Sequence, residues 1–204
     1  MKNKGERIEM KFHYGGMYRS EADFKVEPKH VEGEVPFKEP GHTKFAIVAN
    51  LGCILLFIIL IYFVYHMEGI DAKKLFGGLR GGALIALVTL LPHEFLHATC
   101  FKEDVYLYLN PAKCLLFVHG TESMTKKRFV FMSMLPNIVF GLIPFVVFLF
   151  DHDFYLIGIA SCYCIAMGFG DYINVFNALT QMPKGAKTFL SGFHSYWYLD
   201  KDEK

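Results

Sequence analysis

Four apolar blocks, each long enough to cross a lipid bilayer, constrain this chain more than any other feature of its sequence. They run over residues 45–65, 78–101, 129–150 and 154–182, with few charges inside them. A helix needs about 20 apolar residues to span the hydrocarbon core of a bilayer. Lipid cannot satisfy open backbone groups, so each block has to be helical. The sequence therefore predicts an all-α membrane protein with four transmembrane helices.

Proline and glycine predict irregularities in two of these helices. Pro136 and Pro144 lie inside the third block, where each removes a backbone donor, and we expect them to kink that helix. The fourth block is the longest, and we expect it to tilt or to break near Gly168 and Gly170. The third and fourth helices are therefore not expected to be straight.

A polar insertion, residues 102–128, separates the second block from the third. Residues 105–109 are rich in β-forming side chains, Asn110 and Pro111 form a turn signal, and a second apolar run covers residues 114–119. The insertion is therefore predicted to form a small β-hairpin, lying at the membrane surface.

The blocks divide the chain into three predicted parts: an N-terminal tail of residues 1–44, a four-span membrane domain of residues 45–183 that includes the insertion, and a C-terminal tail of residues 184–204. Eighteen of the 21 Lys and Arg residues lie in the two tails and the insertion. Four spans place these segments on one side of the membrane, and cytoplasmic segments carry the excess of basic residues. Both termini are therefore predicted to be cytoplasmic.

Charge and cysteine content exclude two other classes of protein. The net charge is only +1, and the aromatic residues lie in apolar blocks and not along a basic stripe, so we expect no nucleic-acid partner. The cysteines are odd in number and form no disulfide framework, and we interpret them as small apolar residues. They are Cys53, Cys100, Cys114, Cys162 and Cys164.

The second block carries the sequence His93-Glu94-Phe95-Leu96-His97. His93 and His97 are four residues apart, so on a helix their imidazoles lie on one face and can bind one metal ion. Glu94 flanks the same position, where a carboxylate can take a proton from water and later give it to a leaving amine. Ionisable groups at membrane depth are costly and mark function. The motif therefore predicts a zinc site with Glu94 as its catalytic base.

Zinc needs a third protein ligand, and Asp171 is the one acid within the fourth block. A lone buried carboxylate is expected to be paired or bound to metal. Counted from the cytoplasmic ends of their helices, Asp171 and His93 lie at similar depths, and Gly168 and Gly170 allow two helices to approach closely. The alternative for Asp171 is a helix-end residue paired with Arg80 or another polar group.

Two asparagines and one further histidine have more than one interpretation. Asn174 lies one turn after Asp171 and could hold that ligand or bind a substrate carbonyl, and Asn137 has the same two possibilities. For both, a hydrogen bond between helices is the alternative. Among the histidines outside the motif, which lack ligand spacing, His119 in the predicted hairpin is the alternative metal ligand to test.

These residues resemble the site-2 protease type of intramembrane zinc protease, and more closely a group of bacterial membrane proteins described as zincin peptidases. The similarity covers roughly residues 80–180 and rests on four features. They are HEFLHA at 93–98, the β-like insertion before a basic start of the third block, Leu-Pro-Asn at 135–137, and Gly-Asp-Tyr-Ile-Asn at 170–174.

The resemblance implies a peptidase of the bacterial cell membrane with one zinc ion, the ligands His93, His97 and Asp171, and the base Glu94. Its expected partners are a lipid bilayer and a membrane-protein or peptide substrate. Site-2 proteases usually carry an Asn-Pro-rich stretch before Asp-Gly, whereas here Tyr172 follows the aspartate and Asn174 comes after it. The substrate-binding asparagine therefore carries over poorly. The insertion is also too short for a PDZ-like domain.

Three functions remain open at this point. The first is a zinc-dependent peptidase that cleaves within or beside the membrane near the cytoplasmic leaflet, with the substrate extended along an edge strand of the predicted hairpin. The second is a non-catalytic membrane adaptor with a structural or relic metal site. The third is a metal transporter or sensor, which would need further acids or histidines along the spans.

Overall fold

The computed structural model describes residues 12–67, 69–113 and 115–200. Its α-helices are α1 (His42–Tyr65), α2 (Ala72–Thr99), α3 (Lys126–Pro136), α4 (Ile143–Phe150), α5 (Tyr155–Met167) and α6 (Phe169–Gln181). Its strands are β1 (Phe12–Met17), β2 (Val35–Pro36), β3 (Val105–Asn110), β4 (Leu115–His119), β5 (Met124–Thr125), β6 (Ala186–Ser191) and β7 (His194–Leu199). The remaining turns of helix are η1 (Glu21–Asp23), η2 (Pro111–Lys113), η4 (His152–Phe154) and the π-helical η3 (Asn137–Leu142).

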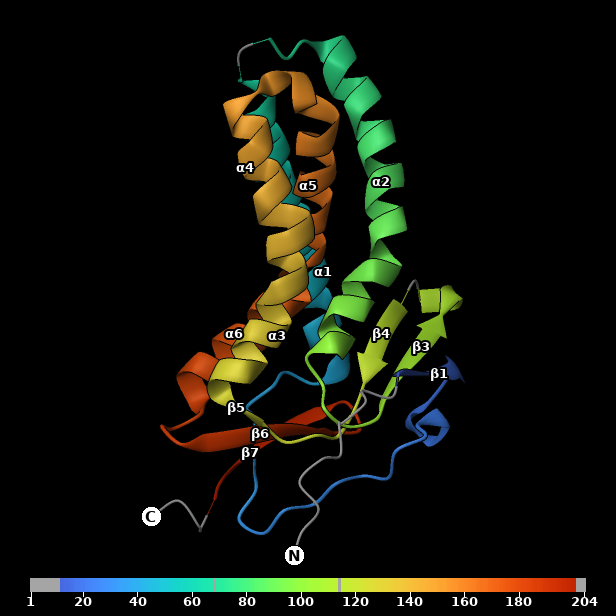
Figure 1. Cartoon of the computed structure of the whole chain (residues 1–204), viewed down its shortest axis with the longest axis vertical. Coiled ribbons are helices and arrows are strands. Elements are labelled where there is room, and N and C mark those ends of the chain that lie inside the picture. Colours follow the sequence, from blue (N-terminus) through green and yellow to red (C-terminus); the bar gives the residue numbers. More distant parts are fainter. Residues whose placement is uncertain (1–11, 68, 114, 201–204) are drawn as a thin grey trace, which may run out of the picture.

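Long apolar helices form a bundle, and the strands gather at one end of it (Figure 1). Three helices are long and apolar enough to cross a membrane: Thr43–Tyr65, Ala72–Thr99 and the continuous stretch Lys126–Phe150. The prediction of four spans is therefore confirmed for three of them among the described residues. The fourth apolar block is a bent pair of helices, α5 and α6, which counts as a span only if the pair is taken together.

The bend in the fourth block falls at Gly168, between α5 and α6. The two parts of the block are inclined to one another by 48°. A Cβ atom placed on Gly168 would lie 1.6 Å from the Oδ1 atom of Asn137, so only glycine lets the chain pass so close to that side chain. The break therefore brings the first turn of α6 against the third apolar helix, and Asp171 lies in that turn.

The third apolar helix is irregular between its two prolines. It continues from α3 through the π-helical η3 into α4, where Pro144 lies in the first turn. A π-helical turn widens the helix locally and is frequently found at functional sites. Asn137 is its first residue and is almost fully buried.

The predicted hairpin is confirmed as β3 and β4, with η2 at its turn. The prediction that it is the whole β structure is wrong, because β1 from the N-terminal tail pairs with β3 in parallel. The resulting sheet has the order β1-β3-β4, which places β4 at an edge. In a two-stranded hairpin, each strand has one edge with unpaired backbone N–H and C=O groups. Pairing with β1 satisfies these groups on β3.

A second sheet joins segments from both tails and was also missed. Its order is β2-β7-β6-β5, so the C-terminal hairpin of β6 and β7 lies between short strands from the N-terminal tail and the insertion. Residues 186–199 hold two runs of β-forming and aromatic side chains around Gly192, which adopts a φ of 59°. That hairpin signal was present in the sequence, and the predicted C-terminal tail therefore contains strands that the prediction did not include.

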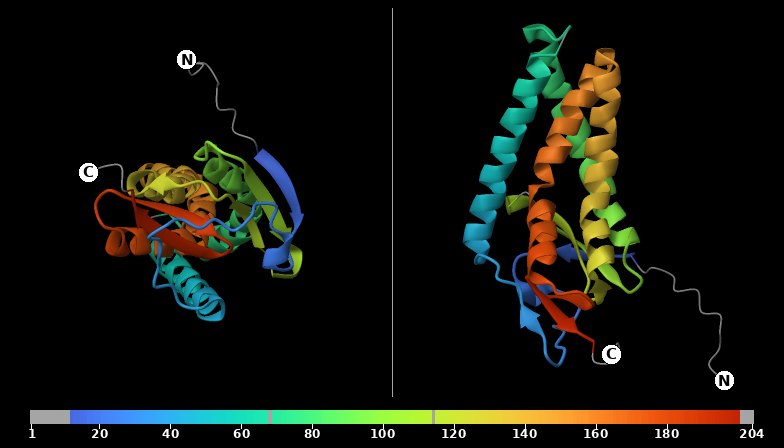
Figure 2. Two further views of the ribbon diagram at one scale, coloured as in Figure 1. Left: turned by 90° about the horizontal axis from the view of Figure 1, so that it is seen from below. Right: turned by 90° about the vertical axis from the view of Figure 1, so that its left-hand side faces the viewer.

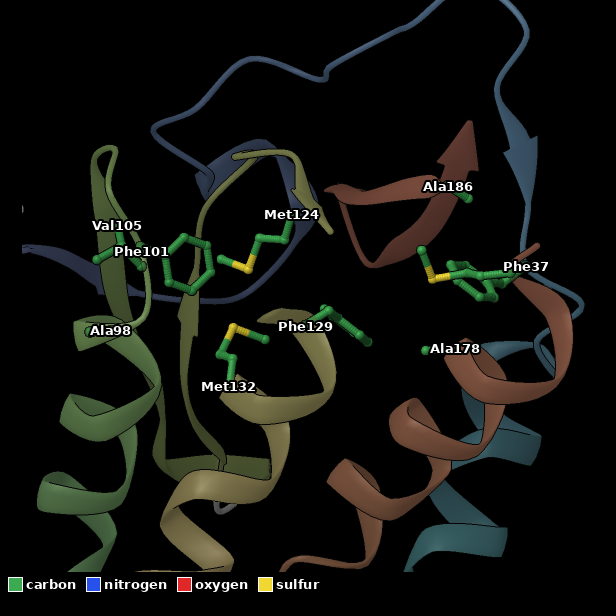
Figure 3. Close-up of a cluster of buried hydrophobic side chains, with 10 residues drawn as sticks. Phe37, Ala98, Phe101, Val105, Met124, Phe129, Met132, Ala178 and Ala186 are labelled. Atoms are coloured by element: carbon green, nitrogen blue, oxygen red, sulfur yellow. The ribbon is translucent and has the colours of Figure 1, made fainter. Parts of the chain in front are cut away.

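The two sheets are joined to the helices by one hydrophobic cluster (Figure 3). Its buried members come from the end of α2, the hairpin, α3, α6, β6 and the segment before α1. They are Phe37, Ala98, Phe101, Val105, Met124, Phe129, Met132, Ala178, Met182 and Ala186. The right-hand view of Figure 2 shows the strands below the helices, at one end of the bundle. The described parts of both tails and of the insertion thus share one end of the molecule, as four-span topology predicts.

A buried ion pair joins the end of α2 to the start of α3. Glu122 accepts hydrogen bonds from the backbone N–H groups of Lys102 and Glu103, and it pairs with Arg128. Arg128 also donates to the carbonyl of Cys100 at the end of α2. Burial alone would raise the pKa of Glu122, but the Arg128 guanidinium and the two backbone donors hold it below its ordinary value. The Glu122–Arg128 pair and its hydrogen bonds to the backbone therefore fix the C-terminal end of α2 relative to the start of α3.

Candidate metal centre

His93, Glu94 and His97 lie in the last two turns of α2, close to the sheets. The Nε2 atoms of His93 and His97 are 3.1 Å apart, so the two imidazoles converge on one point. Together with a carboxylate oxygen of Glu94, their donor atoms all lie within 4.8 Å of one another. The spacing of four residues therefore has the geometric result that the sequence predicts.

A hydrogen bond from a neighbouring helix orients His97. Its Nδ1 atom lies 2.9 Å from the backbone carbonyl oxygen of Met132 in α3. A carbonyl oxygen can only accept, so Nδ1 carries the proton and donates it. In the neutral imidazole Nε2 is then left with a free lone pair directed at His93. A metal-binding histidine is usually held in this way by a partner on its other nitrogen.

Asp171 completes a triangle of donor atoms. Its Oδ2 atom lies 3.5 Å from Nε2 of His93, and its Oδ1 atom lies 3.5 Å from Nε2 of His97. Four ligands arranged tetrahedrally around zinc at ~2.0–2.1 Å are separated from one another by about 3.3 Å. The separations of 3.1, 3.5 and 3.5 Å are close to that value, although each imidazole faces a different oxygen of the carboxylate. Two imidazoles and one carboxylate are also a common catalytic zinc set, so these residues fit the ion.

Glu94 is held at the edge of the neighbouring sheet. Its Oε2 atom accepts a hydrogen bond of 3.0 Å from the backbone N–H of Val118 in β4. The Asp171 carboxylate lies 3.5 Å from both imidazoles and accepts a hydrogen bond from Asn137 in the third apolar helix, so the two carboxylates have different surroundings. This difference favours Asp171 as the metal ligand and leaves Glu94 beside the ion.

Asn137 lies behind the Asp171 carboxylate. Its amide Nδ2 donates to Oδ2 of Asp171 at 2.8 Å and to the carbonyl oxygen of Ser133 at 3.1 Å. Tyr172 donates from its hydroxyl to the carbonyl of Ile165 at 2.9 Å and lies 3.4 Å from Oδ1 of Asn137. Both amide protons of Asn137 are therefore used within the protein, which favours positioning of Asp171 over contact with a substrate.

Replacement of Asn137 by alanine is expected to weaken zinc binding about 10–100-fold, the usual effect of losing a residue that orients a metal ligand. The cause is the lost hydrogen bond to Asp171, since Asn137 does not itself reach the imidazoles. Competition with a chromophoric chelator measures the affinity. Asn50→Ala, at an exposed position on α1, is the matched control and should bind zinc as the wild type does. Unchanged affinity in Asn137→Ala would show that the carboxylate is held by other groups.

The site opens into a cavity of about 450 Å³. Apolar side chains from α2, α3, β4 and the β6–β7 hairpin dominate its wall, among them Phe101, Phe117, Phe129 and Phe193. Asn174 also lines this cavity, so it remains accessible to a bound molecule. A cavity of this volume is within the range that small ligands and peptide side chains fill.

The other sequence-based candidates lie apart from this cluster. His119 lines the cavity, but its Nε2 atom donates to the carbonyl oxygen of Gly192 at 2.9 Å. Among the described residues, the donor atoms of His93, Glu94 and His97 lie close enough together to hold a metal ion, and His119 does not belong to this group. Cys162 and Cys164 are buried free thiols within α5. Sequence reasoning did not find the role of the Met132 carbonyl, since a backbone group leaves no signal in residue type.

Comparison with known proteins gives one match. A family model with the description "Putative zincin peptidase" matches residues 86–187, which is half of the chain. The matched region includes the motif in α2, the hairpin, the third apolar helix and Asp171. No curated protein and no solved structure matches this chain.

Proposed function

The chain belongs to the zincin peptidase family, and we propose that it is a zinc metallopeptidase that cleaves a peptide bond within or beside the membrane, near the cytoplasmic leaflet. The observation that carries the proposal is the triangle of donor atoms from His93, His97 and Asp171 beside the carboxylate of Glu94. Family membership supports the metallopeptidase class. The position of cleavage relative to the membrane is our own extension.

His93, His97 and Asp171 would hold the zinc ion. When bound, zinc polarises a carbonyl group and lowers the pKa of water to about 7. Glu94 takes a proton from the attacking water and gives it to the leaving amine as the peptide bond breaks. The bond from Val118 N–H keeps Glu94 between the metal centre and β4, and Asn137 keeps Asp171 oriented.

The free edge of β4 is the proposed position of the substrate backbone. Val118 directs its N–H toward Glu94 and away from β3, so Leu116, two residues earlier, presents its backbone groups to the same side. An extended peptide adds to such an edge as a further strand. Asn174 of α6 lines the cavity, which supports a role as donor to a substrate carbonyl. The substrate is then a peptide segment that is unwound where it is cut.

The apolar helices and the charge distribution support a membrane location. Among the described residues, three helices are long and apolar enough to span a membrane, and the described parts of the tails and of the insertion lie at the end of the bundle that holds the site. The excess of basic residues in these segments supports a cytoplasmic position for that end by the positive-inside rule. We propose an integral protein of the bacterial cell membrane with both termini in the cytoplasm.

The direct test of the proposal is zinc-dependent hydrolysis. We expect the full chain in detergent micelles to cleave short internally quenched peptides, to lose this activity when a chelator removes the metal, and to regain it when zinc is restored. A sham treatment with chelator already saturated by zinc is the control. Hydrolysis that survives complete removal of metal, or zinc-loaded protein that cleaves none of the peptides, would contradict the proposal.

A further inference from the structure

The loop end of the C-terminal hairpin lies over the metal centre. We call residues 190–194 the hairpin tip. Leu190, Gly192 and Phe193 line the same cavity as His93, Glu94 and Asp171. At the base of the hairpin, β5 pairs with residues 187 and 188 of β6, and β2 pairs with residues 196 and 197 of β7. Strands β2 and β5 thus pair with the base of the hairpin, whereas the hairpin tip extends beyond both strands.

One side chain of β4 bonds to the hairpin tip. His119 donates from Nε2 to the carbonyl oxygen of Gly192 at 2.9 Å, and its ring stacks on Phe24 with 4.1 Å between ring centroids. Burial holds the pKa of His119 below its ordinary value, so the ring is neutral at pH 7 and its one N–H is directed at the tip. Its Nδ1 atom is buried and has no hydrogen-bond partner among the described residues. An unsatisfied buried acceptor makes this closed arrangement less stable than a fully bonded one.

An aromatic cluster packs against the tip. The Phe193 ring packs against Tyr18, Phe117 and Phe24 at centroid distances of 5.1, 5.2 and 5.3 Å. Glu21 also lies close, because a Cβ atom placed on Gly192 would be 2.6 Å from its Oε2 atom. These contacts of the tip come from β4 and from the N-terminal segment, and they can be changed without altering the proposed metal ligands.

We propose that the hairpin tip is a lid over the metal centre, latched to β4 by His119, and that it opens to admit a polypeptide. An extended chain that pairs with β4 beside Val118 has to continue past His119, where the bond to Gly192 closes the path. His119 directly follows the residue whose N–H holds Glu94, so the latch and the proposed base share one short stretch of strand. The inference rests on the proposed function for its purpose, but the opening itself can be measured without hydrolysis.

Hydrogen exchange tests the opening. His119→Phe keeps an aromatic ring on Phe24 and removes the N–H that holds Gly192. We expect amides of the tip and of β4 to exchange about two- to tenfold faster in this variant, the range for loss of one neutral hydrogen bond. Amides at the hairpin base and in the long helices should be unchanged. Leu199→Ala, at an exposed position at the base, is the matched control and should leave the tip unaffected. Unchanged exchange at the tip, or equal acceleration along the whole hairpin, would overturn the lid.

A cross-link tests whether opening controls access. Glu21→Cys combined with His194→Cys, joined by a short bifunctional maleimide, should keep its zinc and lose peptide hydrolysis, whereas each single variant treated with the same reagent should stay active. A locked protein that hydrolyses peptides at the wild-type rate would refute the lid while leaving the peptidase assignment intact. A wild type that cleaves nothing would instead refute the peptidase assignment, and the exchange experiment would still decide the lid.

Discussion

The variant Glu94→Gln is expected to bind zinc as the wild type does and to hydrolyse peptides about 10²–10⁴-fold more slowly, the usual contribution of a general acid–base group. Glutamine has the same shape, and its amide oxygen can still accept the hydrogen bond from Val118. It cannot take a proton from water at neutral pH. The loss should therefore appear in kcat, with little change in zinc affinity. Initial rates on quenched peptides and a zinc titration measure the two quantities.

Glu103→Gln is the matched control for this variant. Glu103 lies a few residues beyond α2, and its side chain is exposed, so the same chemical change is made outside the cavity. It should retain full activity. If Glu94→Gln remained as active as Glu103→Gln, Glu94 would not be the base. A non-catalytic adaptor with a structural metal site would show bound zinc, no hydrolysis in the wild type and no effect of either substitution.

The second large effect is expected for Asp171→Ala, which should weaken zinc binding roughly 10²–10³-fold. Structural zinc sites release about 10–16 kcal/mol on binding, and an equal share for each of four ligands is about 3–4 kcal/mol. The variant would keep only His93 and His97 as protein ligands, and both come from α2. The effect of removing the carboxylate therefore shows whether α2 and α6 together supply the metal ligands or whether α2 alone does. Competition titration of zinc gives the affinity directly.

Asp153→Ala is the control for Asp171→Ala, since Asp153 is an exposed aspartate between α4 and α5. Its zinc affinity should equal that of the wild type. An Asp171→Ala variant that kept wild-type affinity would show that Glu94 or another group is the third ligand. His97→Ala supplies the positive comparison, because the loss of an imidazole should be at least as severe.

Much of the helical framework could be predicted because it follows from local sequence. The apolar blocks determine α1, α2 and the third apolar helix, and the spacing of His93 and His97 determines that their rings converge. The break at Gly168 was predicted from the length of the fourth block and its two glycines, and the structure adds the close contact with Asn137 as the reason for glycine at that position. Whether the bent pair α5 and α6 forms one span could not be predicted, because block length alone does not show where a helix turns.

The β structure and the support of the site depend on contacts between distant segments. The β1 strand pairs with β3 across nearly one hundred residues, and nothing in the composition of residues 12–17 identifies that partner. Likewise, Asn137 and the Met132 carbonyl gain their roles only when α3 packs against α2 and α6. The sequence predicted which side chains come together at the proposed metal centre, and it named Asn137 as one possible support for Asp171. It did not predict the Met132 carbonyl that orients His97.

Zinc K-edge X-ray absorption of the zinc-loaded wild type beside Asp171→Ala tests the central claim most directly. That claim is that two imidazoles of α2 and one carboxylate of α6 bind a common ion. We predict a first shell of nitrogen and oxygen atoms at ~2.0–2.2 Å with two imidazole rings, and the loss of one oxygen in the variant. A sulfur shell at ~2.3 Å, or identical first shells in the two proteins, would contradict it.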